Sequence, residues 1–183
     1  MLDRTSKEKD PKGLILLVQE LSRQMERHAA GRKNPSLRHE YNIHISDLLN
    51  ATIAATHADF GTAQLFDDEQ RSLKIVAQHG FEKDFLSYFQ TVRDDEGCAC
   101  SAVLKSRERI VIEDVASNPY FSNGAREIVL RAKVQSVAST PLIDFSGNLI
   151  GVVSTHFSRQ RIPTEKVWTH VDDLVSNFIT AAQ

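Results

Sequence analysis

The chain has 183 residues, of which 41% are hydrophobic and 25% are charged, and this composition is typical of a globular domain with a buried core. A formal net charge of -2 gives no general electrostatic reason to bind nucleic acid or an anionic membrane surface. The longest apolar run, residues 14–18, is far shorter than the roughly 20 residues of a membrane-spanning helix. Two cysteines separated by one residue indicate a reducing compartment rather than a disulfide framework. We therefore expect a cytoplasmic protein with no nucleic acid and no membrane among its partners.

The first 40 residues carry an excess of positive charge, with nine lysines and arginines against six aspartates and glutamates. Because the two signs are interleaved, this segment is more typical of a solvated helix face than of a tail that binds an acidic partner. Apolar residues at helical spacing predict a helix over residues 12–30, which Gly31 ends. We assign residues 1–38 to a charged tail with an amphipathic helix and residues 39–183 to the main domain.

A second helix is predicted over residues 39–57, which contain no glycine or proline. The hydrophobic period then changes, and residues 60–66 and 73–78 are predicted to be strands joined by a polar hairpin loop. In the second strand, alternate residues are expected to share one apolar face, namely Leu73, Ile75 and Ala77.

The remaining elements are a helix over residues 81–90, a strand over 107–112, a helix over 124–133, two strands over 136–144 and 149–157, and a last helix that Pro163 and Thr164 open. Hairpins that follow one another without regular strand–helix–strand alternation favour an antiparallel sheet. We therefore expect an α+β fold with a central antiparallel sheet of five or six strands and flanking helices. The terminal helices would bury their apolar stripes on the sheet or against a second copy of the chain.

Within residues 94–157, five stretches resemble, in order, motifs of the GAF domain, a small-molecule-sensing module of bacterial signalling proteins. They are residues 96–104, 109–115, 118–121, 137–142 and 147–157. Ser139-Thr140-Pro141-Leu142 and Ser154-Thr155-His156-Phe157 are similar to the GAF domains found beside histidine kinase modules. With its flanking helices, the resemblance covers about residues 40–180.

The resemblance implies a GAF/PAS-like sheet with helices on one face and a ligand cavity, roofed by loops and short helices, on the other. It also implies a signal-transduction sensor in a two-component system, which binds a small-molecule ligand or senses redox state. The terminal helices would pair two protomers into a homodimer and relay the signal to a histidine kinase or another signalling protein. No enzymatic activity is expected.

Two other functions stay open. In the first, the domain binds no ligand because its own side chains fill the cavity, and it serves dimerisation or interaction. In the second, it is a thiol-dependent enzyme that uses Cys100, although free methionine sulfoxide reductases, which are GAF-like, need more cysteines than this chain has. No cofactor is identified: Cys98 and Cys100 are not followed by the histidine of a bilin attachment site, and the cyclic-nucleotide pattern of GAF domains is absent.

Cys98 and Cys100 are the first candidates for chemistry. A thiolate reacts or binds metal only where its surroundings lower its pKa. Two cysteines without further ligands at suitable spacing do not make a zinc site, so no metal is expected. The two residues are either a redox pair or small apolar residues packed at the start of a helix.

Other candidate ligand-binding residues lie later in the chain. His156 sits in an otherwise apolar strand and either faces the cavity, where it would hold a ligand carboxylate or a haem iron, or is a hydrogen-bonded edge histidine. Asp114 either caps backbone amides of its loop or orients a ligand from the rim. The remaining candidates are the roof aromatics Tyr120 and Phe121 and the inward strand hydroxyls Thr140 and Thr155.

Overall fold

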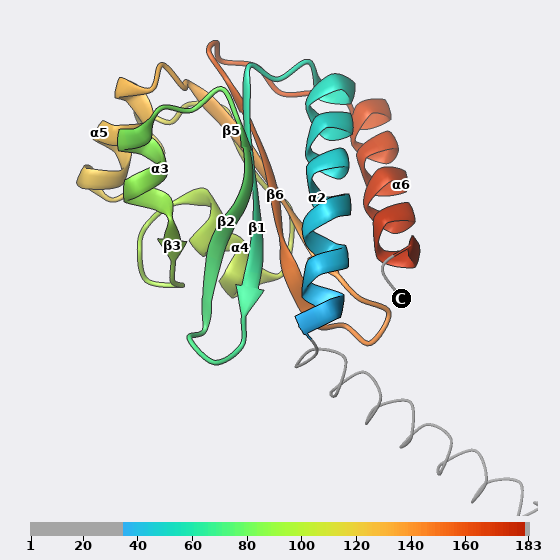
Figure 1. Ribbon diagram of the computed structural model, residues 1–183. Coiled ribbons are helices and arrows are strands. Elements are labelled where there is room, and N and C mark those ends of the chain that lie inside the picture. The colour runs from blue at the N-terminus through green and yellow to red at the C-terminus, as the bar shows by residue number, and fades with distance from the viewer. Residues whose placement is uncertain (1–34, 182–183) are drawn as a thin grey trace, which may run out of the picture. The chain divides into compact units, whose positions relative to one another are not determined.

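The computed structural model describes residues 35–181, so the expected charged tail and the helix over residues 12–30 lie outside the described residues. Its elements are α2 (Pro35–Thr56), β1 (Phe60–Asp67), β2 (Ser72–His79), α3 (Lys83–Phe89), β3 (Thr91–Val92), α4 (Ala99–Ser106), β4 (Ile110–Ile112), α5 (Asn123–Arg131), β5 (Ser136–Ile143), β6 (Leu149–Phe157) and α6 (Glu165–Ala181) (Figure 1). Most match the expected elements, but β3 and α4 were not in the predicted order. The description below concerns the compact unit that begins at Tyr41.

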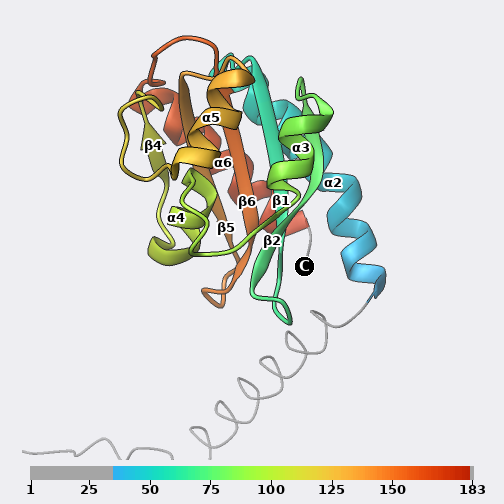
Figure 2. The same ribbon diagram turned by 90° about the vertical axis from the view of Figure 1, so that its left-hand side faces the viewer.

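The six strands form one antiparallel sheet in the order β3-β2-β1-β6-β5-β4. The two central strands, β1 and β6, are distant in sequence and pair directly, with Phe60 opposite His156. Helices α2 and α6 lie side by side on one face of this sheet, and α3, α4 and α5 lie on the other (Figures 1 and 2). The expected α+β class with a central antiparallel sheet is therefore confirmed.

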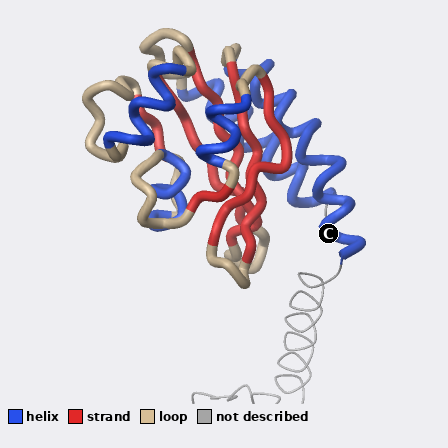
Figure 3. The backbone as a smooth tube through the Cα atoms, turned by 60° about the vertical axis from the view of Figure 1, so that its left-hand side comes forward, coloured by secondary structure: helices blue, strands red, loops and turns tan. Residues whose placement is uncertain are grey.

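Each face of the sheet has its own apolar core. On the α2/α6 face, Ile45 and Leu49 of α2 and Phe178 of α6 pack on strand residues such as Val153. On the opposite face, a larger apolar cluster joins strands to α3, α4 and α5. Figure 3 shows helices on both sides of the strands. Burial of each large apolar side chain stabilises the fold by about 1.5–3 kcal/mol, so both helix layers are held mainly by their sheet-facing stripes. Of the described helices, none is both long and apolar enough to cross a membrane.

A β-bulge interrupts the pairing of β1 with β2. Ala63 is opposite Ala77, whereas the next residue, Gln64, is opposite Ile75, so β2 carries Val76 as an extra residue. Ile75 therefore packs in the core beneath α3 and α5, while Ala77 packs on the α2/α6 side. The expectation that Ala77 shares a face with Leu73 and Ile75 is wrong, because a bulge shifts the two-residue alternation by one position.

Two glycines shape the β5–β6 hairpin for different reasons. Gly147 has φ +80°, a left-handed conformation that glycine adopts without steric cost in a tight turn. Gly151 is the third residue of β6 and lies opposite Leu65, where an added Cβ would collide with the backbone carbonyl of Gln64. The first glycine permits the turn and the second permits close approach of β1 to β6.

Candidate functional site

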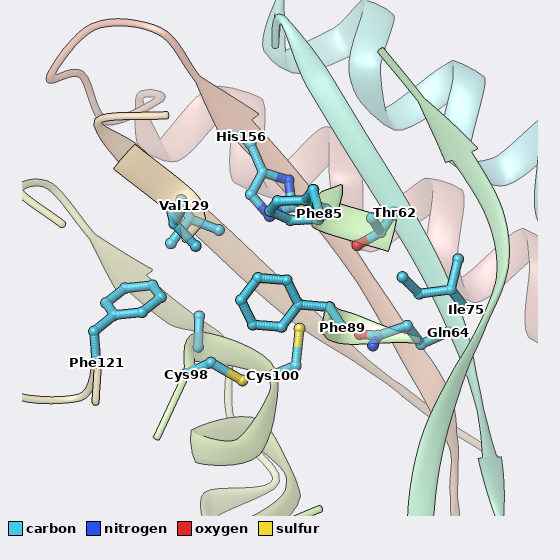
Figure 4. Close-up of a pocket in the computed structure, with 12 residues that line it drawn as sticks. Thr62, Gln64, Ile75, Phe85, Phe89, Cys98, Cys100, Phe121, Val129 and His156 are labelled. Atoms are coloured by element: carbon cyan, nitrogen blue, oxygen red, sulfur yellow. The ribbon is translucent and has the colours of Figure 1, made fainter. Parts of the chain in front are cut away.

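A small pocket lies between the sheet and helices α3, α4 and α5 (Figure 4). Side chains from four strands and from all three helices converge on it. The residues that line it are Thr62, Gln64, Ile75, Val137 and His156 from the sheet, and Phe85, Phe89, Cys98, Ala99, Cys100, Phe121 and Val129 from the roof.

The pocket is almost filled by its own side chains. Its volume is about 20 Å³, enough for one or two water-sized molecules and far below the roughly 300 Å³ or more of typical ligand sites. Phe85, Phe89 and Phe121 are buried against it. Arg126 holds the segment before α5 in place, because its guanidinium donates to the carbonyls of Asn118 and Phe121. A larger molecule would therefore have to displace the aromatic roof.

Two buried polar side chains face this pocket without a hydrogen-bond partner in the described part of the chain. They are Gln64, through Oε1, and His156, through Nδ1. Gln64 is 1% exposed and His156 is 6% exposed, and a buried polar group left unpaired costs about 1–3 kcal/mol.

His156 lies beneath two aromatic rings and has an apolar environment. The ring centroids of Phe81 and Phe85 are 4.9 Å and 5.9 Å from its imidazole, both in edge-on orientation. Burial disfavours the charged form and lowers the pKa of His156 to about 3. The imidazole is therefore neutral at physiological pH and can accept a hydrogen bond at one nitrogen.

Cys100 contributes a thiol to the same pocket. It is the second residue of α4, whose first turn is fixed by the Ser101 hydroxyl: this hydroxyl accepts from the N–H of Cys98 and donates to the carbonyl of Cys98. The Cys100 Sγ lies 3.4 Å from the Ser154 Oγ and 3.8 Å from the Ser139 Oγ, and the two hydroxyls are 2.8 Å apart. Neighbouring strands thus present two hydroxyls to one sulfur.

These surroundings shift the pKa values of the two thiols in opposite directions. A hydrogen bond from Cys98 is the main cause that lowers the pKa of Cys100 to about 7, and the hydroxyls of Ser154 and Ser139 add to it against the effect of burial. The same pairing, together with burial, raises the pKa of Cys98 well above its usual value. Near neutral pH, Cys100 is a partly ionised nucleophile and Cys98 is a neutral donor.

We expect the thiolate absorbance of Cys100 to rise about tenfold between pH 6 and pH 8 and then to level off, because the thiolate fraction saturates above a pKa near 7. Among the described residues, the other titratable side chains facing the pocket are Cys98 and His156. Ultraviolet difference spectra between wild type and Cys100→Ser check the profile without a reagent that has to enter the pocket. Cys98→Ala should move the rise to higher pH, and a wild-type profile that keeps rising past pH 9 would contradict this assignment.

Three of the predicted ligand-binding residues meet in this pocket: Cys100, Phe121 and His156. The predicted redox partner, Cys98, lines it as well. The structure therefore places His156 on the cavity face, which is the first of the two alternatives drawn from the sequence.

Asp114 and Tyr120 lie outside the pocket. The Asp114 carboxylate accepts from the Ser117 hydroxyl at 2.6 Å and from the Ala116 N–H at 3.0 Å, and the Ser117 bond is the main cause that lowers the pKa of Asp114. The side chain of Tyr120 is 51% exposed, and its backbone N–H donates to Asn118. Asp114 caps its own loop, and only Phe121 of the aromatic pair reaches the cavity.

The prediction that Thr140 and Thr155 point into the cavity is wrong. Both lie on the α2/α6 face of the sheet, since strand residues alternate and their neighbours Ser139, Ser154 and His156 face the pocket. Thr140 accepts a hydrogen bond of 2.9 Å from Nε of Arg109, whose guanidinium stacks over Trp168 of α6 and pairs with Asp172. Thr155 is opposite Ala138, which packs against Trp168.

Sequence reasoning missed the polar residues that complete the site: Gln64, Ser139 and Ser154. The signal for the serines was available, because Ser139 and Ser154 begin the two four-residue pieces that are similar to GAF domains beside histidine kinase modules. Ser154 also shares a strand face with His156 two residues later. Gln64 gave no such signal, since a lone glutamine in a strand is ordinarily solvent-exposed.

A second hollow of about 340 Å³ lies between the start of α3 and the end of α5 and shares Phe85 with the first. Its rim carries both acidic and basic residues, namely Glu82, Asp84, Arg131 and Lys133. Within the described part of the chain, no three histidine, cysteine or acidic residues are grouped so that they could hold a metal ion.

Comparisons with known proteins agree on one fold. A family model described as GAF domain matches residues 44–172. No curated protein matches the chain.

Several solved structures are similar to the chain. A domain of a two-component sensor histidine kinase protein from Sinorhizobium meliloti 1021 is 19% identical, with a TM-score of 0.63 and coverage of 75% of this chain and 88% of that one. The PixJ GAF domain of Thermosynechococcus elongatus, in its blue-light-absorbing form, is 14% identical, with a TM-score of 0.64 and coverage of 81% and 88%. The free methionine-R-sulfoxide reductase of Neisseria meningitidis is 14% identical, with a TM-score of 0.61 and coverage of 78% and 79%.

Proposed function

This chain belongs to the GAF domain family, and we propose on that premise that it is a sensor module of signal transduction and not an enzyme. Its input site is the pocket beneath α3, α4 and α5, and its output passes through α2 and α6. As a cytoplasmic homodimer, it signals to a histidine kinase or another signalling protein. The similarity to a domain of a sensor histidine kinase protein supports this choice of partner.

One observation carries the proposal: the largely apolar pocket contains two buried polar groups that lack partners. Within the described residues, Oε1 of Gln64 and Nδ1 of His156 are buried and unpaired, and both residues line the cavity. Two unpaired polar groups destabilise the folded protein, and apolar side chains in their place would not. A core that served stability alone would therefore not contain them. A small molecule with hydrogen-bond donors would satisfy them, so the site favours binding.

The route from this pocket to the output helices is short. Ser139 faces the pocket, while its neighbours Ala138 and Thr140 face α6, where Ala138 packs against Trp168. Closely packed layers transmit small displacements, because they have few alternative arrangements. A change beneath the roof therefore reaches α6 across a single sheet.

A second function, a ligand-free interaction domain, is favoured by the volume of about 20 Å³. Three phenylalanines occupy the space in which a metabolite would bind. This alternative predicts that the purified protein has the mass of the chain alone and that no small molecule stabilises it.

The test is thermal and chemical unfolding of the full chain in the presence of small polar molecules, together with native mass spectrometry. At a concentration of 100 times its Kd, a bound molecule should raise the free energy of unfolding by about 2.7 kcal/mol. Gln64→Leu should abolish the stabilisation while the protein remains folded.

Thr155→Val is the matched control, because Thr155 is equally buried but faces α6, and it should keep the full effect. If neither the mass nor the stability of folded protein changes with any compound, the interaction-domain alternative replaces this proposal.

A further inference from the structure

The size of the pocket limits what can enter it without moving the roof. About 20 Å³ corresponds to one or two water-sized molecules, so an input that fits the observed arrangement has only a few atoms. Metabolites of the size of an amino acid or a nucleotide do not meet this condition.

The sulfur that borders this space is placed for reaction. The Cys100 Sγ is in the first turn of α4 and has hydroxyl groups at 3.4 Å and 3.8 Å, from Ser154 and Ser139. Hydroxyl donors and the N-terminal end of a helix stabilise a thiolate and equally the anionic oxygen of an oxidised sulfur. A neutral thiol, Cys98, lines the same pocket.

The unpaired groups in the pocket select the chemistry of the molecule. Oε1 of Gln64 can only accept a hydrogen bond, and neutral His156 accepts at one of its ring nitrogens. A small molecule that pairs with both must donate to Gln64, and at Nδ1 of His156 it donates or accepts according to which ring nitrogen carries the proton. Hydrogen peroxide has two O–H donors, has only two heavy atoms, and reacts with thiolates.

We propose that this pocket detects hydrogen peroxide and that Cys100 is oxidised there to a sulfenic acid, an inference that rests on the sensor function proposed above. The thiolate sulfur attacks one peroxide oxygen, an S–O bond forms and the O–O bond breaks. Sulfur loses two electrons, and the peroxide gains them. The second oxygen leaves as hydroxide, which takes up a proton to become water.

Oxidation changes the packing of the site. The added oxygen occupies a cavity that has room for little else and lies beside Phe89 and Phe121, which line it. Because α4 also packs on β5, the strand that contacts α6 on its other face, the modification is sited on the route to the output helix. The thiol is restored by a cellular thiol reductant, as sulfenic acids are reversible.

The experiment treats the reduced full chain at pH 7 with hydrogen peroxide or with tert-butyl hydroperoxide, removes the oxidant, and then unfolds the protein in urea with dimedone, which traps the sulfenic acid for peptide mass spectrometry. Hydrogen peroxide should oxidise Cys100 at least about tenfold faster than it oxidises Cys98, since the pKa values of the two thiols are shifted in opposite directions. The ratio of the oxidation rate with hydrogen peroxide to the rate with tert-butyl hydroperoxide should be higher in the folded protein than in the urea-unfolded protein. The reason is that the alkyl group does not fit the pocket.

Ser154→Ala removes the hydroxyl nearest to the sulfur. If the pKa of Cys100 rises by about one unit, oxidation at pH 7 should slow about fivefold and recover at higher pH. A merely structural effect would not move this pH profile. Thr155→Val, one residue later on the opposite face, should react like wild type.

Equal rates for both cysteines, or the same peroxide preference in folded and unfolded protein, would overturn the inference. If Cys100 does not react but another small molecule stabilises the protein in a Gln64-dependent way, the sensor function stands without the peroxide chemistry. If both experiments fail on folded protein, both proposals are wrong.

Discussion

Replacing Gly151 by alanine is expected to lower the free energy of unfolding by about 3 kcal/mol or more, and the melting temperature by about 10 °C. Gly151 lies in β6 opposite Leu65, where the two central strands pair. An added Cβ would collide with the backbone carbonyl of Gln64, and a backbone atom cannot move aside as a flexible side chain can. Relief requires separation of β1 from β6, which breaks ladder hydrogen bonds at the centre of the sheet.

Gly147→Ala provides the matched control, because it makes the same chemical change in the same hairpin. Gly147 has φ +80°, and nothing among the described residues lies within 4 Å of the position of an added Cβ. Only the left-handed backbone conformation is penalised, at about 1 kcal/mol. Urea unfolding of both variants measures the difference. Equal losses of unfolding free energy in the two variants would show that Gly151 is not needed for the close approach of β1 to β6.

The free energy of unfolding is also expected to fall by about 2 kcal/mol between pH 7 and pH 5 because of His156. Burial lowers the pKa of His156 from 6.5 to about 3 in the folded protein. Below pH 6.5, the unfolded chain therefore binds a proton that the folded protein does not bind. Stability is lost as the pH falls through this window, and the loss stops only near pH 3, where the folded protein also takes up the proton.

Urea unfolding at several pH values checks this slope, and His156→Phe should flatten it. His79→Gln, at the exposed end of β2, should leave the slope unchanged. The lowered pKa values of Asp67 and Asp114 act only below their ordinary value of 3.8 and do not enter this window. The lowered pKa of Cys100, near 7, adds a loss of only about 0.4 kcal/mol at the upper end of the window, which Cys100→Ser should remove. If the slope persists in His156→Phe, the buried imidazole is not its cause.

The two pocket proposals depend on the same aromatic roof. Phe85 lines both hollows and stacks on Phe81 with ring centroids 3.6 Å apart. Because Phe85 lines both hollows, we expect a ligand that extends from the small pocket toward the wider one to displace this ring. Detection of a few-atom oxidant needs no such displacement, whereas binding of a larger ligand does, so the size of an active compound also reports whether the roof opens.

Local patterns in the sequence determined most of the elements and the class of the fold. The strand over residues 149–157 agrees with β6 residue by residue, and the last helix begins close to Pro163 as expected. Such elements carry their signal within a few residues, through strand alternation, turn-forming residues and helical spacing. The order of motifs likewise identified the family, because each motif is a short stretch that can be recognised from neighbouring residues alone.

The elements missing from the predicted order have a weak local signal. β3 has only two residues, Thr91 and Val92, and exists because they pair with Lys74 and Leu73 of β2. α4 was expected only as one alternative for the two cysteines, a helix that starts there and has no predicted end. It has eight residues, among which small side chains prevail, and its position follows from contacts with β4 and β5. Both depend on residues that are far away in the chain.

Tertiary structure alone decided which face of each strand became the site. Alternation divides β5 and β6 into two faces, but it does not say which face α3, α4 and α5 will cover, and for this reason Thr140 and Thr155 were assigned to the wrong one. The bulge at Val76 reversed the face of Ala77 in the same way. The volume of the pocket and the two hydroxyls beside Cys100 are also properties of packing between distant strands and helices, and no local pattern encodes them.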